Sequence, residues 1–226
     1  MRYLPQPNAS LPLKEKLRSG LAGGAALGVL GWTLSLLLPP GPQQTLLIGS
    51  IAASAVLLFA APHSPLAQPW NLVLGHGLSA IVGWCCSLLF IHPVLAGALA
   101  VGLSILLMHL LDSLHPPGAA TALTLVLGST QFHHAGFIWT ALLVMGNVAG
   151  SLLLALLFNN MMPGRRYPAP SAPTQPPLRT ADTEPEPEDL RWALSQMDGV
   201  IDVSAEDVLE AYRLAKHRAT ERALRH

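Results

Sequence analysis

Long apolar stretches, separated by short polar or proline-containing turns, fill the chain from about residue 20 to residue 160. Five of them are long enough, or nearly so, to cross the roughly 30 Å hydrocarbon core of a bilayer as helices. They are residues 21–38, 45–61, 72–90, 94–111 and 136–158. A sixth stretch, 118–128, is only 11 residues long and directly follows two prolines. It is therefore expected to form a half-helix or a re-entrant segment.

The second half of this apolar region repeats the first at an offset of 67 residues. Residues 52–58 match residues 119–125, and Gly83 falls on Gly150. Each half then consists of a helix, a short segment and a helix, and an odd number of crossings per half predicts inverted halves. The expected fold class is all-α: a polytopic membrane helix bundle of two inverted three-segment repeats, with short or re-entrant segments and a small helical cytoplasmic tail.

Charge supports a membrane location. The 146 residues between Arg18 and Arg165 hold one formally charged side chain, Asp112, although 12% of the whole chain is charged. No soluble domain of that size presents so little charge to water, and a charged group inside lipid is costly unless it is paired or hydrated. The net charge of +0 gives no argument for a nucleic-acid partner.

Positive charge also predicts the orientation. Lys and Arg flank the first and last apolar stretches and are absent from the loops between them. The positive-inside rule therefore places both ends in the cytoplasm, with an even number of crossings. Six short crossings satisfy this rule, and so do four full crossings with two re-entrant segments. The expected divisions are a cytoplasmic N-terminal segment 1–18, a transmembrane domain 19–164, a Pro-rich linker 165–188 and a short helical cytoplasmic tail 189–226.

The segment from Asp112 to Thr121 is the sharpest candidate site. His115, Pro116 and Pro117 interrupt a helix, because proline lacks an N–H donor and fixes its φ angle. A helix that restarts at Gly118 would present free N–H groups and its positive dipole end to an anion at depth. His115 and Thr121 would add donors, and Asp112 would orient His115 or relay a proton. The alternative is a tight turn at the membrane face, with Asp112 simply in water.

A second polar cluster precedes the third apolar stretch. Asn71 and His76 are expected to face inward, close to Ser54, which the repeat aligns with Thr121. The alternative is an ordinary interfacial loop. The residues show no nucleophile–base pair for catalysis and no metal-ligand set, so no catalytic residue, metal or other cofactor is expected.

The block 111–123, which contains His115-Pro116-Pro117-Gly118, resembles the signature of the HPP family of integral membrane proteins. Residues 54–59, residues 64–69 with Asn71 and His76, and residues 159–168 resemble other blocks of that family. The resemblance covers about residues 15–168, so that 19–164 would be a transmembrane HPP domain. It implies a small multi-helix membrane domain. Plant chloroplast and cyanobacterial members are associated with nitrite transport, whereas most bacterial members have no assigned substrate.

These observations favour a transporter or channel for a small solute, with an inorganic anion such as nitrite preferred, in the bacterial inner (plasma) membrane. The alternative is a membrane-embedded sensor or assembly subunit whose cytoplasmic tail recruits a partner. An enzyme is not expected. The expected partners are the lipid bilayer, a small anion or other solute and, optionally, further copies of the chain as a homo-oligomer, but no nucleic acid.

Overall fold

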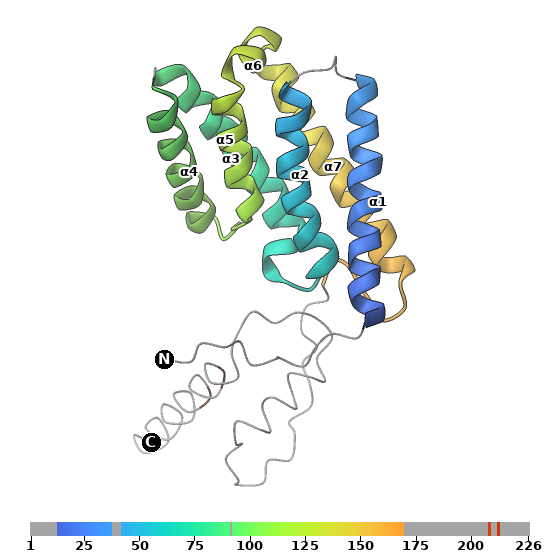
Figure 1. Cartoon of the computed structure of the whole chain (residues 1–226). Coiled ribbons are helices and arrows are strands. Elements are labelled where there is room, and N and C mark those ends of the chain that lie inside the picture. Colours follow the sequence, from blue (N-terminus) through green and yellow to red (C-terminus); the bar gives the residue numbers. More distant parts are fainter. Residues whose placement is uncertain (1–12, 38–41, 91, 170–207, 209–211, 213–226) are drawn as a thin grey trace, which may run out of the picture. The chain divides into compact units, whose positions relative to one another are not determined.

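In the part of the chain that the structure describes, seven α-helices and a 3-10 turn follow one another between Leu13 and Met161 (Figure 1). The computed structural model describes residues 13–37, 42–90 and 92–169, and the single residues Val208 and Tyr212. The elements are α1 (Leu13–Leu37), α2 (Pro42–Ala60), η1 (Pro65–Ala67), α3 (Pro69–Leu89), α4 (Pro93–Leu110), α5 (Pro116–Leu127), α6 (Ser129–Ala135) and α7 (Phe137–Met161). The all-α prediction is confirmed.

Prolines begin helices here as well as ending them. Pro42, Pro69, Pro93 and Pro116 are the first residues of α2, α3, α4 and α5. The first helical position suits proline, because the N–H that it lacks would have no intrahelical partner there. The sequence predicted that this helix would begin at Gly118. Helix α5 instead begins two residues earlier, at Pro116.

Two helical segments differ more strongly from the expected pattern. Helix α1 begins at Leu13, so that Lys14, Lys16 and Arg18, expected in a flanking segment, are helical. Residues 129–135 form the short helix α6, although their polar residues suggested a turn. Apolar stretches report the part of a helix that faces lipid, whereas good helix formers such as Lys and Arg can continue the helix into water.

Successive long helices run in opposite directions through the bundle. Helices α1, α3 and α5 point one way, and α2, α4 and α7 point the other way (Figure 1). The first residues of α1 and the last residues of α7 therefore lie at the same end of the bundle, and α6 lies at the opposite end (Figure 1). The main packed pairs are α1–α2, α4–α5, α3–α4, α1–α7, α3–α5, α2–α7, α2–α5 and α3–α7.

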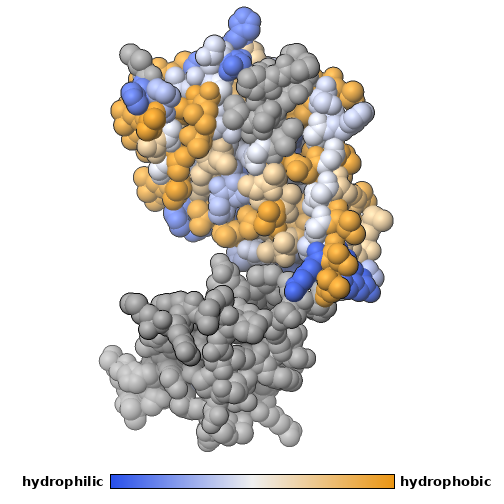
Figure 2. Space-filling view, viewed as in Figure 1, coloured by the Kyte–Doolittle hydropathy of each residue, from blue (hydrophilic) through white to orange (hydrophobic). Residues whose placement is uncertain are grey.

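Four of the described helices are long and apolar enough to cross a membrane: α1, α3, α4 and α7. Helix α5 and the Gly49–Ala60 part of α2 are shorter apolar helices. Hydrophobic residues cover much of the visible face of the helical part, and strongly hydrophilic residues lie mainly toward its two ends (Figure 2). Exposed side chains such as Trp32, Leu89 and Ile138 suit a surface that faces lipid.

Glycines bring α3 and α5 into backbone contact. A Cβ atom on Gly118 would lie 2.5 Å from the carbonyl oxygen of Gly75, and a Cβ atom on Gly75 would lie 2.6 Å from Cβ of His115. Further along the same pair, a Cβ atom on Gly83 would lie 2.5 Å from the carbonyl oxygen of Ala122. Small residues permit membrane helices to approach this closely. These contacts place the start of α5 against the first third of α3, at Gly75, and Ala122 against Gly83.

A buried arginine joins three helices at the end of the bundle where α1 begins. The Arg165 guanidinium donates to Glu15 Oε1 from Nε at 2.6 Å and to Ser19 Oγ from Nη2 at 2.7 Å, and its Nη2 also pairs with Glu15. Its Nη1 donates to the carbonyl oxygen of Phe59 at 3.0 Å and to Asn159 Oδ1 at 3.2 Å. Arg165 had been expected in a solvated linker, but its bonds make it part of the bundle.

The other predictions about the two ends of the chain concern residues that the structure does not describe. The linker beyond residue 169 lies outside the described residues. The short helical tail expected at residues 189–226 lies there too, apart from Val208 and Tyr212.

Candidate functional site

Four polar side chains meet inside the bundle, and each comes from a different place in the fold. Ser54 lies on α2, His76 on α3 and Thr121 on α5, and His115 is the N-cap residue of α5. Their exposed fractions are 1%, 4%, 1% and 0%, in that order. A buried polar group is costly unless it is hydrogen-bonded. The partners of these four side chains therefore define the site.

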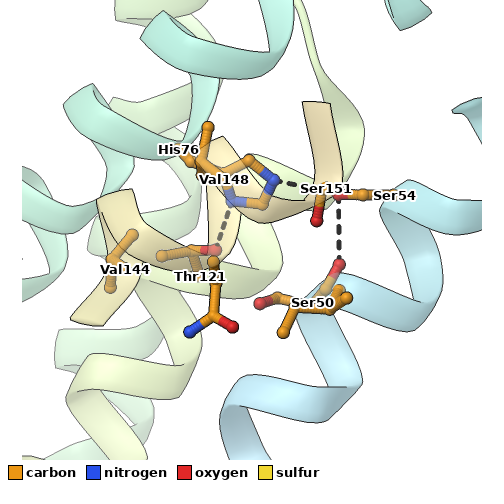
Figure 3. Close-up of a pocket in the computed structure, with 9 residues that line it drawn as sticks. Ser50, Ser54, His76, Thr121, Val144, Val148 and Ser151 are labelled. Carbon is orange, nitrogen blue, oxygen red and sulfur yellow. Dashed lines mark hydrogen bonds between the residues drawn. The ribbon is translucent and has the colours of Figure 1, made fainter. Parts of the chain in front are cut away.

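A continuous series of hydrogen bonds links the four side chains to η1. Thr121 Oγ1 lies 2.7 Å from His76 Nδ1, and His76 Nε2 lies 2.9 Å from Ser54 Oγ. Ser54 Oγ also lies 3.1 Å from His115 Nε2, and His115 Nδ1 lies 2.8 Å from the carbonyl oxygen of Leu66. We call this series, Thr121–His76–Ser54–His115–Leu66, the polar chain. Figure 3 shows the His76 ring between Thr121 and Ser54.

The Leu66 carbonyl sets the direction of donation along the polar chain. A carbonyl oxygen only accepts, so His115 Nδ1 carries a hydrogen, and in the neutral ring Nε2 is then an acceptor. Ser54 donates to that Nε2 and accepts from His76 Nε2–H. His76 Nδ1 is left to accept from the Thr121 hydroxyl. Both histidine tautomers follow from the network.

Ser54 has one competing acceptor. The carbonyl oxygen of Ser50, one turn earlier in α2, lies 3.2 Å from Ser54 Oγ (Figure 3). The single Ser54 hydrogen favours His115 Nε2, because among the described residues that nitrogen has no other donor. A buried acceptor without a donor costs about 1–3 kcal/mol, so donation to His115 gives the lower energy.

A small cavity borders the polar chain where α2, α3, α5 and α7 meet. Its lining residues are Ser50, Ile51, Ser54, His76, Thr121, Val144, Asn147, Val148 and Ser151 (Figure 3). The space open to water centres is about 10 Å³, which is about what one water molecule requires. In this conformation the cavity therefore has room for a water-sized group.

Helix α7 contributes two cavity residues that the sequence analysis did not single out. Asn147 Nδ2 donates to the carbonyl oxygen of Leu143 at 2.8 Å. Within the described part of the chain, neither Asn147 Oδ1 nor Ser151 Oγ has a protein partner, so both can serve a molecule in the cavity. Their spacing of four residues in an apolar helix puts them on one face. That spacing was the sequence signal for them.

The start of α5 does not offer the free N–H groups that the sequence analysis expected. Pro116 and Pro117 occupy the first two helical positions and have no N–H. The Gly118 N–H donates to the carbonyl oxygen of His115 at 2.8 Å. Gly118 faces the α3 backbone at Gly75, so it serves helix packing and does not leave space for a solute.

Asp112 lies outside the polar chain, which corrects its expected role beside His115. Its side chain is exposed, and no hydrogen bond or ion pair to it occurs among the described residues. Its φ of 47° is left-handed. The Asp112 N–H donates to His109 O at 3.3 Å and the Ser113 N–H to Met108 O at 2.8 Å, the pattern of a Schellman cap. Asp112 therefore ends α4, and the carbonyl of Leu66 orients His115.

Asn71 supports the segment before the two prolines and does not reach the cavity. Its Nδ2 donates to the carbonyl oxygen of Leu114 at 3.0 Å, and Trp70 Nε1 donates to that of Leu111 at 3.3 Å. Both carbonyls lie beyond or at the end of α4, where intrahelical partners are missing. The first turn of α3 thus holds the connection that places His115.

The segment after α7 holds the loop that carries Leu66. The Tyr167 hydroxyl donates to the carbonyl oxygen of Ala67 at 2.7 Å, and the Ala169 N–H donates to Gln68 Oε1 at 2.9 Å. Tyr167 is buried, and burial raises the pKa of its phenol, because the charged form is disfavoured away from water. We call Tyr167 and Ala169, with their bonds to this loop, the latch.

Comparisons with known proteins identify relatives. The family described as HPP, transmembrane region, matches residues 8–168. Two transmembrane proteins of Dictyostelium discoideum are 47% and 48% identical to the chain over 130 residues. These matches cover 56% of this chain and 45% and 42% of the relatives, so the chain spans less than half the length of the curated relatives that it matches. No solved structure matches the chain.

Proposed function

Since the chain belongs to the HPP transmembrane family, we propose that it is a transporter or channel for a small solute, with an inorganic anion such as nitrite favoured, and that it is not an enzyme. The observation that carries this proposal is the polar chain beside a water-sized cavity, buried inside a bundle with a lipid-type surface. Polar and ionisable side chains inside membrane helices are costly to bury, and those that face the interior of a bundle often mark solute pathways.

Two inverted halves form the second part of the proposal, with α1, α2 and α3 corresponding to α4, α5 and α7. Corresponding helices point in opposite directions (Figure 1). Exchanging the halves turns the α1–α2 pair into α4–α5, α3–α4 into α7–α1 and α3–α5 into α7–α2, and every one of these pairs packs. The pairs α2–α5 and α3–α7 join corresponding helices. Binding sites of such transporters lie where the halves meet, which is where the polar chain lies.

The donors at the cavity support a small anion that binds through neutral groups. The hydroxyls of Ser54, Thr121 and Ser151, the amide of Asn147 and the ring of His76 surround it. Oxygen atoms of an anion accept hydrogen bonds from such donors once hydroxyls rotate toward them. A nitrite ion is larger than one water molecule, so binding requires the helices or η1 to move from this conformation. Transporters of inverted halves open by such motion of one part against the other.

The proposed location is the bacterial inner membrane, with both ends of the helical part in the cytoplasm. Lys14, Lys16 and Arg18 at the start of α1 and Arg166 after α7 lie at the same end of the bundle (Figure 1). The positive-inside rule assigns that end to the cytoplasm. The loop that carries Leu66 would then face the cytoplasm, and α6 would face the other side.

Ser54 and His115 form a hydroxyl–imidazole pair of the kind used for nucleophilic catalysis, which sequence reasoning did not find. One feature favours transport over catalysis. Ser54 Oγ is held between two imidazoles and is 1% exposed, so it is not presented to a substrate in this conformation. Labelling of Ser54 by a fluorophosphonate would contradict the proposal and favour a hydrolase.

The experiment is a flux assay with purified protein in proteoliposomes, supplied with nitrite, nitrate, formate or chloride. We expect nitrite uptake above that of protein-free vesicles. Thr121→Val removes the hydroxyl with little change in shape and should lower uptake about tenfold, which corresponds to about 1.4 kcal/mol. The matched control is Thr33→Val, since Thr33 is exposed on α1 and its hydroxyl bonds only the carbonyl of Val29. If no solute is carried, the sensor or assembly-subunit alternative is favoured.

A further inference from the structure

We propose that the proton is the coupling ion of this protein and that His115 carries it. This inference rests on the proposed transport function and adds the identity of the ion that drives it. It is carried by the geometry of the polar chain, in which each side chain donates to the next from the cavity at Thr121 to the loop at Leu66.

A proton that enters from the cavity can pass along the polar chain without any movement of heavy atoms other than rotation of Thr121. The Thr121 hydroxyl turns away, and the proton binds His76 Nδ1. His76 releases its Nε2 proton to Ser54 Oγ, and Ser54 releases its own hydrogen to His115 Nε2. One N–H bond forms and one breaks on His76, and one O–H bond forms and one breaks on Ser54. The net result is an imidazolium at His115 and a neutral His76 of the opposite tautomer.

The transfer stops at His115. Its Nδ1–H faces the carbonyl oxygen of Leu66 at 2.8 Å, and a carbonyl oxygen does not take the proton onward. The same carbonyl stabilises the imidazolium, because a hydrogen bond from a charged donor is stronger than one from a neutral donor. The centroids of the His76 and His115 rings are 5.0 Å apart, so a second charge on His76 is opposed by repulsion. The pair therefore holds one proton.

No charged side chain in the described part of the chain interferes with this role. The polar groups that bond the two rings or line the cavity beside His76 are neutral. They come from α2 (Ser50 and Ser54), α5 (Thr121), α7 (Asn147 and Ser151) and η1 (Leu66). The Arg165 side chain is bound to Glu15, and Asp112 is exposed. A positive His115, bonded to the cavity residue Ser54, would thus attract an anion in the cavity. An anion and a proton would neutralise each other inside the bundle, where a single charge is costly.

Release of the proton requires the Leu66 carbonyl to leave His115. Once this loop moves, His115 Nδ1–H can pass its proton to water on that side of the bundle. The latch bonds from Tyr167 and Ala169 hold the same loop. Movement of the loop that carries Leu66 would therefore both open the cavity to solute on that side and permit release of the proton there.

The wild-type protein in proteoliposomes provides the first test, with nitrite as the probe. Uptake of one proton with each nitrite is electroneutral. A pH gradient, acidic outside, should therefore drive accumulation, whereas a membrane potential set by potassium and valinomycin should not. Protein-free vesicles correct for nitrous acid that crosses the lipid unaided. If the potential drives uptake and the pH gradient does not, proton coupling is wrong while the transport proposal stands. If no nitrite moves at all, transport of nitrite itself is contradicted.

Two variants test whether His115 carries the proton. His115→Asn can keep a donor to Leu66, and His115→Gln can keep an acceptor for Ser54, but neither side chain takes up a proton. In both, the nitrite flux that remains should respond to the potential and no longer to the pH gradient. The controls His109→Asn and His109→Gln alter an exposed histidine of α4. Flux that stays pH-driven in both His115 variants would exclude His115 as the carrier.

Nitrogen NMR of wild-type protein labelled at histidine gives a readout that does not depend on the variants folding. We expect the Nδ1–H tautomer for His115 and the Nε2–H tautomer for His76 at neutral pH, with His115 gaining the second proton on acidification. The opposite tautomers, or a His115 that stays neutral while His76 gains the proton, would overturn the assignment.

Discussion

Ser54 and Thr121, which lie 67 residues apart and are aligned by the proposed internal repeat, bind the two opposite nitrogens of one imidazole, that of His76. The distances are 2.9 Å and 2.7 Å. Two hydroxyls from α2 and α5 thus converge on one side chain of α3. The candidate site therefore lies between these three helices, and in the proposed arrangement of two halves neither half contains it alone.

Helix packing at the site depends on glycine. We predict that Gly118→Ala lowers the thermal stability of the protein in detergent by several degrees. The added Cβ would lie 2.5 Å from the carbonyl oxygen of Gly75, and backbone cannot yield there without separating the helices. Overpacking of this kind costs about 1–3 kcal/mol. Gly102→Ala on α4 is the control, since its Cβ would meet nothing within 4 Å and alanine is the better helix former. Equal melting temperatures for the two variants would contradict the packing role.

The buried guanidinium is predicted to stabilise the end of the bundle. Arg165→Met leaves two buried acceptors, the carbonyl oxygen of Phe59 and Asn159 Oδ1, without the donor that Arg165 supplies, and each buried acceptor without a donor costs about 1–3 kcal/mol. Arg166→Met provides the matched control, because Arg166 is exposed. The melting temperature should fall clearly in Arg165→Met and change little in Arg166→Met. An equal fall in both variants would show that the loss of one positive charge, and not the loss of the buried bonds, causes the effect.

Tyr167 is predicted to restrain the loop that carries Leu66. Tyr167→Phe removes the bond to Ala67 and should increase hydrogen exchange in residues 62–68, with α4 as the internal reference. The folded pKa of the phenol is raised, so its contribution to stability is complete below the unfolded pKa of about 10 and is lost as pH rises further. Wild type should therefore lose more stability than Tyr167→Phe above about pH 10. Identical hydrogen exchange in wild type and Tyr167→Phe would show that Tyr167 does not restrain this loop.

Asp112 is predicted to act through its backbone. Asp112→Gly should leave stability unchanged or raise it slightly, since glycine suits a φ of 47° at the end of a helix. Asp112→Val should destabilise by about 1–2 kcal/mol, because a β-branched residue resists the left-handed region. Asp112→Asn keeps the helix cap and removes the carboxylate. If this variant slows proton-driven nitrite uptake, the Asp112 carboxylate takes part in proton coupling and the prediction is contradicted.

The sequence indicated several of the polar side chains that come together in the bundle, because their signals are local. Ser54, His76 and Thr121 are polar residues within apolar stretches, and the repeat aligned Ser54 with Thr121. Leu66 was missed because it acts through a carbonyl oxygen, which every residue has. The role of Gly118 was misjudged because the close backbone of Gly75 comes from a helix 43 residues earlier in the chain.

Charged residues near the membrane illustrate a second limit of sequence patterns. Asp112 is the single charge in a long neutral region, which predicts a functional group, yet its φ angle and its position after α4 make it a helix cap. Arg165 was assigned to a linker because it follows the last apolar stretch. Its partners Glu15 and Ser19 lie about 150 residues away, so the pairing is visible only after α1 and α7 pack.

A single cysteine at Ser151 tests most directly whether the cavity is the place where the solute binds. Cys85 and Cys86 are first replaced, and the Ser151→Cys protein is reconstituted and exposed to a small, membrane-impermeant thiol reagent. Ser151 lines the cavity from α7, whereas Leu153, 65% exposed, gives the lipid-facing control Leu153→Cys. We predict that the thiol at 151 reacts and that nitrite slows this reaction. The thiol at 153 should not react, with or without nitrite. A thiol at 151 that never reacts, or that reacts at the same rate with and without nitrite, in protein that still carries nitrite, would contradict this prediction.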